Sequence, residues 1–162
     1  MMYILDANVF IEAHRRYYAF DIAPPFWASL VDAASAGRVG SIDWVKKELD
    51  RGNDELTKWA DNKFAQAFAR TDGDDVIQSY GEIMEWVQAQ GQFSDGAKDE
   101  FADGADGWLI AYARVNGYVI VTHEEYAPEA RRKIPIPNVC REFGVQYLDT
   151  FKMLRNMGVR FT

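Results

Sequence analysis

Acidic residues stand at the ends of apolar segments that lie far apart in this chain. Asp6 ends the apolar run 3–5, Asp106 begins a helix-like apolar segment, and Glu124 follows the apolar run 118–121. In an α/β fold, the C-terminal ends of buried strands form the edge at which ligands bind. Carboxylate oxygens are also the donors that Mg²⁺ and Mn²⁺ prefer in proteins. We therefore predict that these three acids share one metal-binding pocket.

A fourth candidate acid, Glu48, lies one helical turn after the apolar pair Trp44 and Val45. Four carboxylates can hold two metal ions, which generate hydroxide and stabilise charge on the attacking and leaving oxygens of a phosphodiester. Two polar residues, Asn8 and Thr122, stand beside the predicted pocket. They either orient ligands or a water there, or form hydrogen bonds with the local backbone.

Strands and helices are predicted to alternate along the chain. Apolar runs predict strands over 2–6, 39–42, 118–122 and 145–148. Apolar spacings of three and four predict helices over 24–37, 43–52, 54–70, 74–90, 105–115, 138–143 and 150–157. Residues 91–104 are predicted to be an acidic, glycine-containing connection. This alternation favours a parallel sheet covered on both faces, so we predict an α/β fold in a single domain over residues 1–162.

Composition and charge restrict the class of protein. The chain has 162 residues and a net charge of −7, which argues against a broad basic footprint for nucleic acid. A nucleic-acid substrate held through metal ions and a few local cations remains compatible with this charge. The best-placed local cations are Arg15, Arg16, Lys46, Lys47, Arg131, Arg132 and Lys133.

The compartment is predicted from cysteine usage and from the apolar runs. Cys140 is the only cysteine, which excludes an internal disulfide, fits a reducing cytoplasm and predicts a small core residue. The N-terminus lacks a basic stretch followed by an apolar signal core. No apolar run approaches the roughly 20 residues that span a bilayer. We therefore expect a cytoplasmic protein that does not enter a membrane.

The order of these motifs resembles that of the PIN-domain nucleases. In that family an apolar strand ends in Asp, a helix carries an acid, an Asp begins an alanine-rich helix, and a strand ends in Thr and an acid. The corresponding segments are Leu5-Asp6-Ala7-Asn8-Val9, Lys46-Lys47-Glu48-Leu49, Ala105-Asp106-Gly107-Trp108-Leu109-Ile110-Ala111 and Val121-Thr122-His123-Glu124. The resemblance covers residues 2 to about 150 and is closest to a toxin-like bacterial branch. Glu124 departs from the pattern, because Asp is more usual at that position.

The resemblance implies a three-layer α/β/α sandwich with a mainly parallel sheet. It implies an endoribonuclease that depends on Mg²⁺ or Mn²⁺ and cleaves single-stranded RNA. It also implies a toxin paired with an antitoxin protein, and it allows a homodimer. The implied catalytic and metal-binding residues are Asp6, Glu48, Asp106 and Glu124, with Asn8, Thr122 and Asp103 in support.

Several residues have an alternative interpretation. Glu125 competes with Glu124 for the site, and one of the two must be a surface residue. Asp103 is expected in the connection or at an N-cap, where it would accept a backbone N–H. His14 and His123 are candidates for a general base, but we expect both to be incidental to the site.

Two other functions compete with the nuclease. A catalytically weak or silent PIN-like module would act only by binding a protein partner. An aspartate-based phosphotransferase or a response-regulator receiver is the third alternative. A phosphotransferase needs a second Asp where Asn8 stands, and a receiver needs a pair of acids where Asp6 stands alone. We rank this third alternative last.

Overall fold

The computed structural model describes residues 1–161, and Thr162, the last residue of the predicted domain, lies outside them. The strands are β1 (Tyr3–Leu5), β2 (Val39–Ile42), β3 (Phe68–Ala69), β4 (Val119–Val121) and β5 (Tyr147–Leu148). The α-helices are α1 (Ala7–Glu12), α2 (Pro24–Ser35), α3 (Asp43–Gly52), α4 (Glu55–Lys63), α5 (Asp74–Ala89), α6 (Asp95–Asp103), α7 (Asp106–Asn116), α8 (Ile136–Phe143) and α9 (Thr150–Asn156). A π-helix, η1 (Ala13–Tyr17), follows α1, and a 3₁₀ turn, η2 (Ala65–Ala67), follows α4.

The five strands form one parallel sheet in the order β3-β2-β1-β4-β5 within the described residues. The chain runs outward from β1 through β2 to β3, then crosses to the other side of β1 to form β4 and β5. The strand order therefore reverses between β1 and β4, where Leu5 pairs with Val121. Open α/β sheets bind their ligands in the crevice at such a reversal. The residues that follow β1 and β4 are thus placed where a site is expected.

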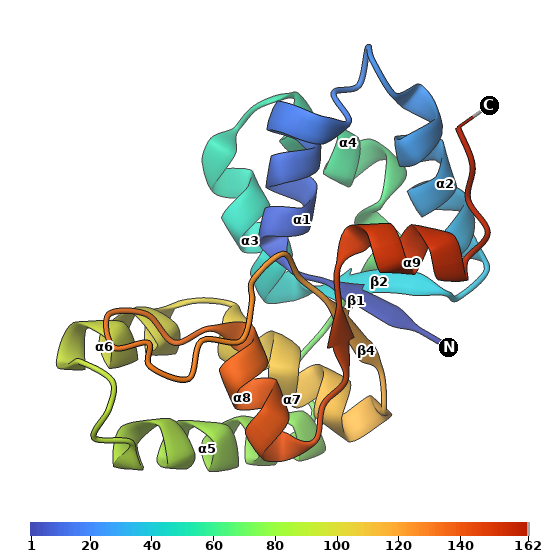
Figure 1. The fold of residues 1–162 in the computed structure, drawn as a ribbon. Coiled ribbons are helices and arrows are strands. Elements are labelled where there is room, and N and C mark those ends of the chain that lie inside the picture. The colour runs from blue at the N-terminus through green and yellow to red at the C-terminus, as the bar shows by residue number, and fades with distance from the viewer. Residues whose placement is uncertain (162) are drawn as a thin grey trace.

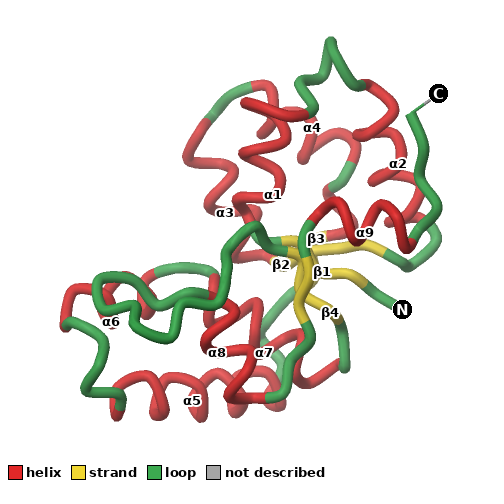
Figure 2. Tube along the Cα trace, in the orientation of Figure 1, coloured by secondary structure: helices red, strands yellow, loops and turns green. Residues whose placement is uncertain are grey.

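Helices cover both faces of the sheet (Figure 1). α1, α2, α4 and α9 lie on one side, and α5, α7 and α8 lie on the other (Figure 2). The predicted three-layer α/β/α sandwich is therefore confirmed. Ile4 and Leu5 of β1 and Ile120 and Val121 of β4 are fully buried, as expected for central parallel strands that are covered on both faces. None of the helices in the described residues is long and apolar enough to span a bilayer.

The helix predicted over 54–70 is shorter in the structure. α4 ends at Lys63, and Phe68 instead pairs with Ser41 as part of β3. The rings of Phe64 and Phe68 both pack on Phe10, with centroids 5.6 and 6.1 Å away. Their spacing of four therefore reflects a shared partner in the core rather than a continuous helix. Contacts from distant segments overrode the local pattern here.

The connection predicted over 91–104 is wrong, because most of it forms helix α6. The Ser94 hydroxyl caps this helix by accepting the Ala97 N–H at 3.1 Å. Ala97 and Phe101, four residues apart, are buried on its inner face. The cap and this buried pair outweigh the helix-disfavouring glycine at position 96. The structure therefore has a further helix beside the ends of β1 and β4.

Candidate active site

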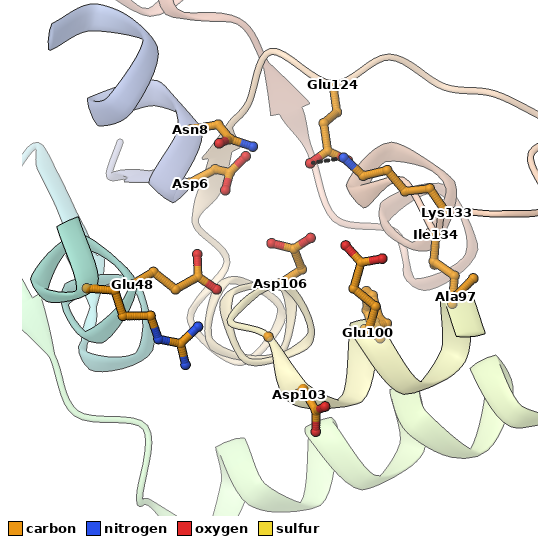
Figure 3. Close-up of a pocket in the computed structure, with 13 residues that line it drawn as sticks. Asp6, Asn8, Glu48, Ala97, Glu100, Asp103, Asp106, Glu124, Lys133 and Ile134 are labelled. Atoms are coloured by element: carbon orange, nitrogen blue, oxygen red, sulfur yellow. Dashed lines mark ion pairs between the residues drawn. The ribbon is translucent and has the colours of Figure 1, made fainter. Parts of the chain in front are cut away.

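The four predicted acids come from four different segments and line one cavity of about 520 Å³. Asp6 follows β1, Glu48 lies in α3, Asp106 begins α7, and Glu124 lies beyond the end of β4. Figure 3 shows their carboxylates pointing into a shared space. The sheet reversal and the start of α7 thus gather residues that are up to 118 positions apart in the chain.

Asp6 is the most buried of these acids, with 3% of its surface exposed. Its carboxylate accepts the Thr122 hydroxyl at 3.1 Å, and it also accepts a backbone hydrogen bond from Asn8. Burial and the nearby charge of Glu124 raise the pKa of Asp6 to about 7, despite these hydrogen bonds. A buried carboxylate beside another acid is the electrostatic arrangement that a bound cation would relieve.

Asp106 is the first residue of α7, and the spacing of the inner stripe of that helix predicted this position correctly. Burial, and then the charges of Asp6, Glu124 and Glu48, raise its pKa well above the ordinary value. Glu48 is fixed beside it, because its carboxylate accepts the N–H of Ala105, the residue before Asp106, at 3.1 Å. This contact joins α3 to the start of α7 and sets the spacing between two of the acids.

Glu124 rather than Glu125 lines the acidic cavity. Its carboxylate accepts the N–H of Ile136 at 3.0 Å and lies 3.6 Å from the Lys133 ammonium group. Thr122 holds this turn in place, since its hydroxyl oxygen accepts the Glu124 N–H at 3.1 Å while its proton goes to Asp6. Glu125 is exposed and does not line this cavity. The structure thus places the longer acid at the position where the family pattern has Asp.

The predicted supporting residues have different positions. Asn8 lines the cavity beside Asp6, and Thr122 forms the hydrogen bonds described above. The expectation for Asp103 is wrong in its local detail: it is the last residue of α6, not a connection or N-cap residue. Asp103 lines the cavity, but its carboxylate points away from the other acids in Figure 3.

One acid of the cavity, Glu100, was not predicted from the sequence. It lies in α6, lines the cavity and points toward Asp106 in Figure 3. Its position depends on α6 being helical, so the incorrect prediction of a connection concealed it. The available signal was Ser94 followed by apolar residues at 97 and 101, which share a helix face.

Both histidines lie outside the acidic cavity. The His123 imidazole is within 3.1 Å of the Thr150 hydroxyl at the start of α9, and the His14 ring packs on Phe20 with centroids 5.0 Å apart. Cys140 is fully buried, as predicted for a core residue, and burial raises the pKa of its thiol to about 12. None of these three side chains therefore supplies a base or nucleophile to the acids.

The residues suit a hard divalent cation by donor type. Several carboxylates face one cavity, and two of them have raised pKa values. Two cations, Arg51 and Lys133, also line it, and of these only Lys133 forms an ion pair in the described part of the chain, with Glu124. Within residues 1–161, however, no group of three or more His, Cys, Asp or Glu side chains is placed to hold a metal ion. Gathering these oxygen ligands around one ion therefore requires side-chain movement, and the backbone contacts of Glu48 and Glu124 must change when it occurs.

A known family model matches this chain. The family described as "Domain of unknown function (DUF4411)" matches residues 3–161, nearly the whole chain. A comparison with curated protein sequences finds no match.

Solved structures share the fold at low sequence identity. A chain of VapBC2 from Rickettsia felis, bound to a DNA fragment from their promoter, is 15% identical, and the match covers 92% of this chain and 98% of that one with a TM-score of 0.56. A chain of FitAcB from Neisseria gonorrhoeae is 17% identical, and the match covers 91% of this chain and 96% of that one with a TM-score of 0.55. A chain of VapBC-1 from nontypeable Haemophilus influenzae is 16% identical, and the match covers 92% of this chain and 98% of that one with a TM-score of 0.55. These matches confirm a PIN-type fold.

Proposed function

The chain belongs to the DUF4411 family, and we propose that it is a divalent-metal-dependent endoribonuclease that cleaves single-stranded RNA. One observation carries the proposal: Asp6, Glu48, Asp106 and Glu124 line a single cavity where the strand order reverses. Acids outnumber the two cations of the cavity, Arg51 and Lys133, and carboxylates clustered at that edge suit the binding of metal ions and phosphodiester cleavage.

The proposed cofactor is Mg²⁺ or Mn²⁺, held by Asp6, Glu48, Asp106 and Glu124. When bound, such an ion would supply a nucleophilic hydroxide and stabilise negative charge on the phosphate oxygens. The protein fixes the direction of the acids: Thr122 orients Asp6, and the Ala105 N–H orients Glu48. Asn8, beside Asp6, is placed to orient a water or the RNA.

We propose a toxin role from the solved structures that are similar to this chain. The similar chains come from VapBC and FitAB assemblies, one of them bound to promoter DNA. We infer that this chain is the toxin of a toxin–antitoxin pair and that its protein partner is the antitoxin. A gene for a small DNA-binding protein beside the gene for this chain would support that pairing, and purification of the two proteins as one complex would test it.

The test of the enzyme is RNA cleavage by purified protein. With Mn²⁺ the protein should cut single-stranded RNA, and Asp6→Asn should abolish cutting while keeping the fold, because asparagine preserves shape but removes charge from the site. The exposed acid Glu129, which lines neither of the two cavities at the site, is changed to Gln as the matched control and should retain activity. Equal cleavage by wild type and Asp6→Asn, in preparations free of contaminating nuclease, would disprove the proposal.

A second function has one observation in its favour. Lys133 pairs with Glu124, and the acids stand too far apart in the described residues to share an ion without moving. A PIN-like module that is catalytically weak or silent and acts by binding a protein would have such a site. Calorimetry decides between the two, since weak or absent Mn²⁺ binding favours this module.

A further inference from the structure

A second cavity, of about 780 Å³, adjoins the acidic one. Asn8 and Glu124 line both cavities, so the two spaces meet at these side chains. The second cavity, called here the aromatic groove, is bordered by the end of η1, the segment after β4, α8, β5 and the start of α9. A chain of nucleotides whose phosphate lies among the acids would have this groove beside it.

Three large aromatic side chains of the groove are exposed. Tyr17, Tyr126 and Phe151 have exposed fractions of 52%, 41% and 41%. Tyr17 ends the π-helix η1, and its ring meets the edge of the Phe151 ring at 6.3 Å between centroids. π-Helical turns often occur at functional sites. Aromatic faces left open beside a reaction site are suited to stacking with flat ligands.

Arg141 is held as a flat, oriented cation within the groove. Its guanidinium group lies over the Tyr126 ring, 3.8 Å from the centroid, and its Nε donates to the Tyr147 hydroxyl at 3.2 Å. No acid of the described residues pairs with Arg141, so its terminal nitrogens keep donors for a phosphate or a base edge. A preorganised Arg–Tyr stack costs little entropy when a ligand binds.

The carboxylates of the groove are partly occupied by the protein itself. Glu12 pairs with Arg16 at 3.2 Å, and Asp149 caps α9 by accepting the Lys152 N–H at 2.8 Å. The ammonium group of Lys152, in contrast, has no acidic partner among residues 1–161. Lys152 and Arg141 thus supply positive charge in a groove that four acids also line. Glu124 pairs with Lys133 outside the groove, and within residues 1–161 Glu125 is the groove acid that has no ion pair or hydrogen bond through its carboxylate.

We propose that the aromatic groove binds a nucleobase of single-stranded RNA, and its phosphate, next to the cleavage position. This subsite rests on the proposed nuclease function. The base stacks on the Tyr126–Arg141 unit, while Lys152 and the terminal nitrogens of Arg141 bind phosphate oxygens. Stacking tolerates every base, so the subsite confers a preference for single strands rather than for one sequence.

Chemistry favours RNA over a protein partner as the occupant. The groove joins the acidic cavity directly, and it combines open aromatic faces with a stacked guanidinium group. That combination is typical of single-strand binding, in which aromatic rings take the bases and cations follow the backbone.

The test separates binding from cleavage. A 5′-fluorescein-labelled oligouridylate of about 12 nucleotides is titrated with Asp6→Asn protein, so that cleavage does not consume the probe, and its anisotropy is measured. In this background Tyr126→Ala and Arg141→Ala should each weaken binding by about 5- to 50-fold. Matched controls are Phe161→Ala, with 42% exposure outside the groove, and Arg155→Ala, an exposed cation of α9 that does not line it. Both controls should bind as the parent does.

Cleavage is measured separately with the same substitutions in wild-type protein. A raised KM with kcat retained in Tyr126→Ala, together with weaker binding, supports the subsite. Equal binding by groove and control variants overturns it, even when wild type cuts RNA. No binding by the parent also overturns it. Absence of cleavage with groove-dependent binding keeps the subsite and rejects the nuclease. If a purified antitoxin instead depends on Tyr126 and the RNA does not, the groove is a protein interface and the proposal fails.

Discussion

The fold raises the pKa of two of the acids, Asp106 and its more deeply buried neighbour Asp6. The Asp6 pKa of about 7 in the folded protein stands against an ordinary value of 3.8. The folded state therefore holds a proton that the unfolded chain has lost between about pH 4 and pH 7. The stabilisation of the folded state by this bound proton is fully present at acidic pH and is lost as the pH rises through that window. The site is thus a source of instability at neutral pH without metal.

Asp6→Asn should therefore stabilise the metal-free protein at high pH. Between pH 4 and pH 8 in chelator, the free energy of unfolding of wild type should fall by on the order of 4 kcal/mol more than that of the variant, which keeps only the pH dependence of the other acids, Asp106 above all. Urea titrations at several pH values measure this, with Asp103→Asn as the control that keeps the wild-type slope. Parallel pH dependences for wild type and Asp6→Asn would contradict the assignment.

Asp106 and Asp103 should respond unequally to the same substitution. Asp106→Asn should weaken Mn²⁺ binding by at least about tenfold, because its carboxylate faces the shared cavity. Asp103→Asn should leave the affinity unchanged, since its carboxylate points away from the other acids. Calorimetric titration of both variants decides the matter. Equal losses would make Asp103 a site residue and show that it turns inward when metal binds.

At the scale of elements, close packing positions the start of α7. A Cβ on Gly107, next to Asp106, would stand 2.9 Å from Cε2 of Tyr80 and 3.1 Å from Cε1 of Phe101. The Tyr80 ring is stacked on Trp108 at 3.8 Å between centroids, which limits its movement. α5, α6 and α7 therefore meet at this glycine without space for a methyl group.

Gly107→Ala should consequently destabilise the fold by about 1–3 kcal/mol and weaken Mn²⁺ binding, because the start of α7 must shift. Gly81→Ala, at an open position inside α5, is the matched control and should stabilise by roughly 0.5–1 kcal/mol. Thermal or urea unfolding measures both changes. If Gly107→Ala leaves both the free energy of unfolding and the Mn²⁺ affinity unchanged, the Tyr80 and Phe101 rings can move aside for a methyl group at little cost.

Local sequence patterns predict some of the helices and strands of this fold but not others. Buried parallel strands are short apolar runs, so β1 and β4 and the acids after them could be predicted locally. α6 could not be predicted in this way, because its glycines and acids resemble a loop and its helix depends on the Ser94 cap and the burial of Phe101. Because α6 was not predicted, Glu100 was not predicted to line the cavity either. The aromatic groove combines side chains from several segments, and a local pattern carries no signal of that kind.

At the scale of the whole molecule, metal should act as a stabiliser. An ion that binds only the folded state adds about 2.7 kcal/mol when its concentration is a hundredfold above Kd. The melting temperature of wild type should therefore rise with Mn²⁺ and fall back when chelator removes the metal. Asp6→Asn should show neither change. An unchanged wild-type midpoint at millimolar Mn²⁺ would exclude a metal site and strengthen the case for a protein-binding module.

The pairing of β1 with β4 also determines when the site can exist during synthesis. Tyr3 has Val119 as its partner in the sheet, so the central pair of strands closes only after more than a hundred further residues have been made. A nascent chain that stops before Thr122 holds Asp6 without the hydroxyl that orients it. The acidic cavity can therefore form only after Glu124 has been synthesised, more than a hundred residues after Asp6.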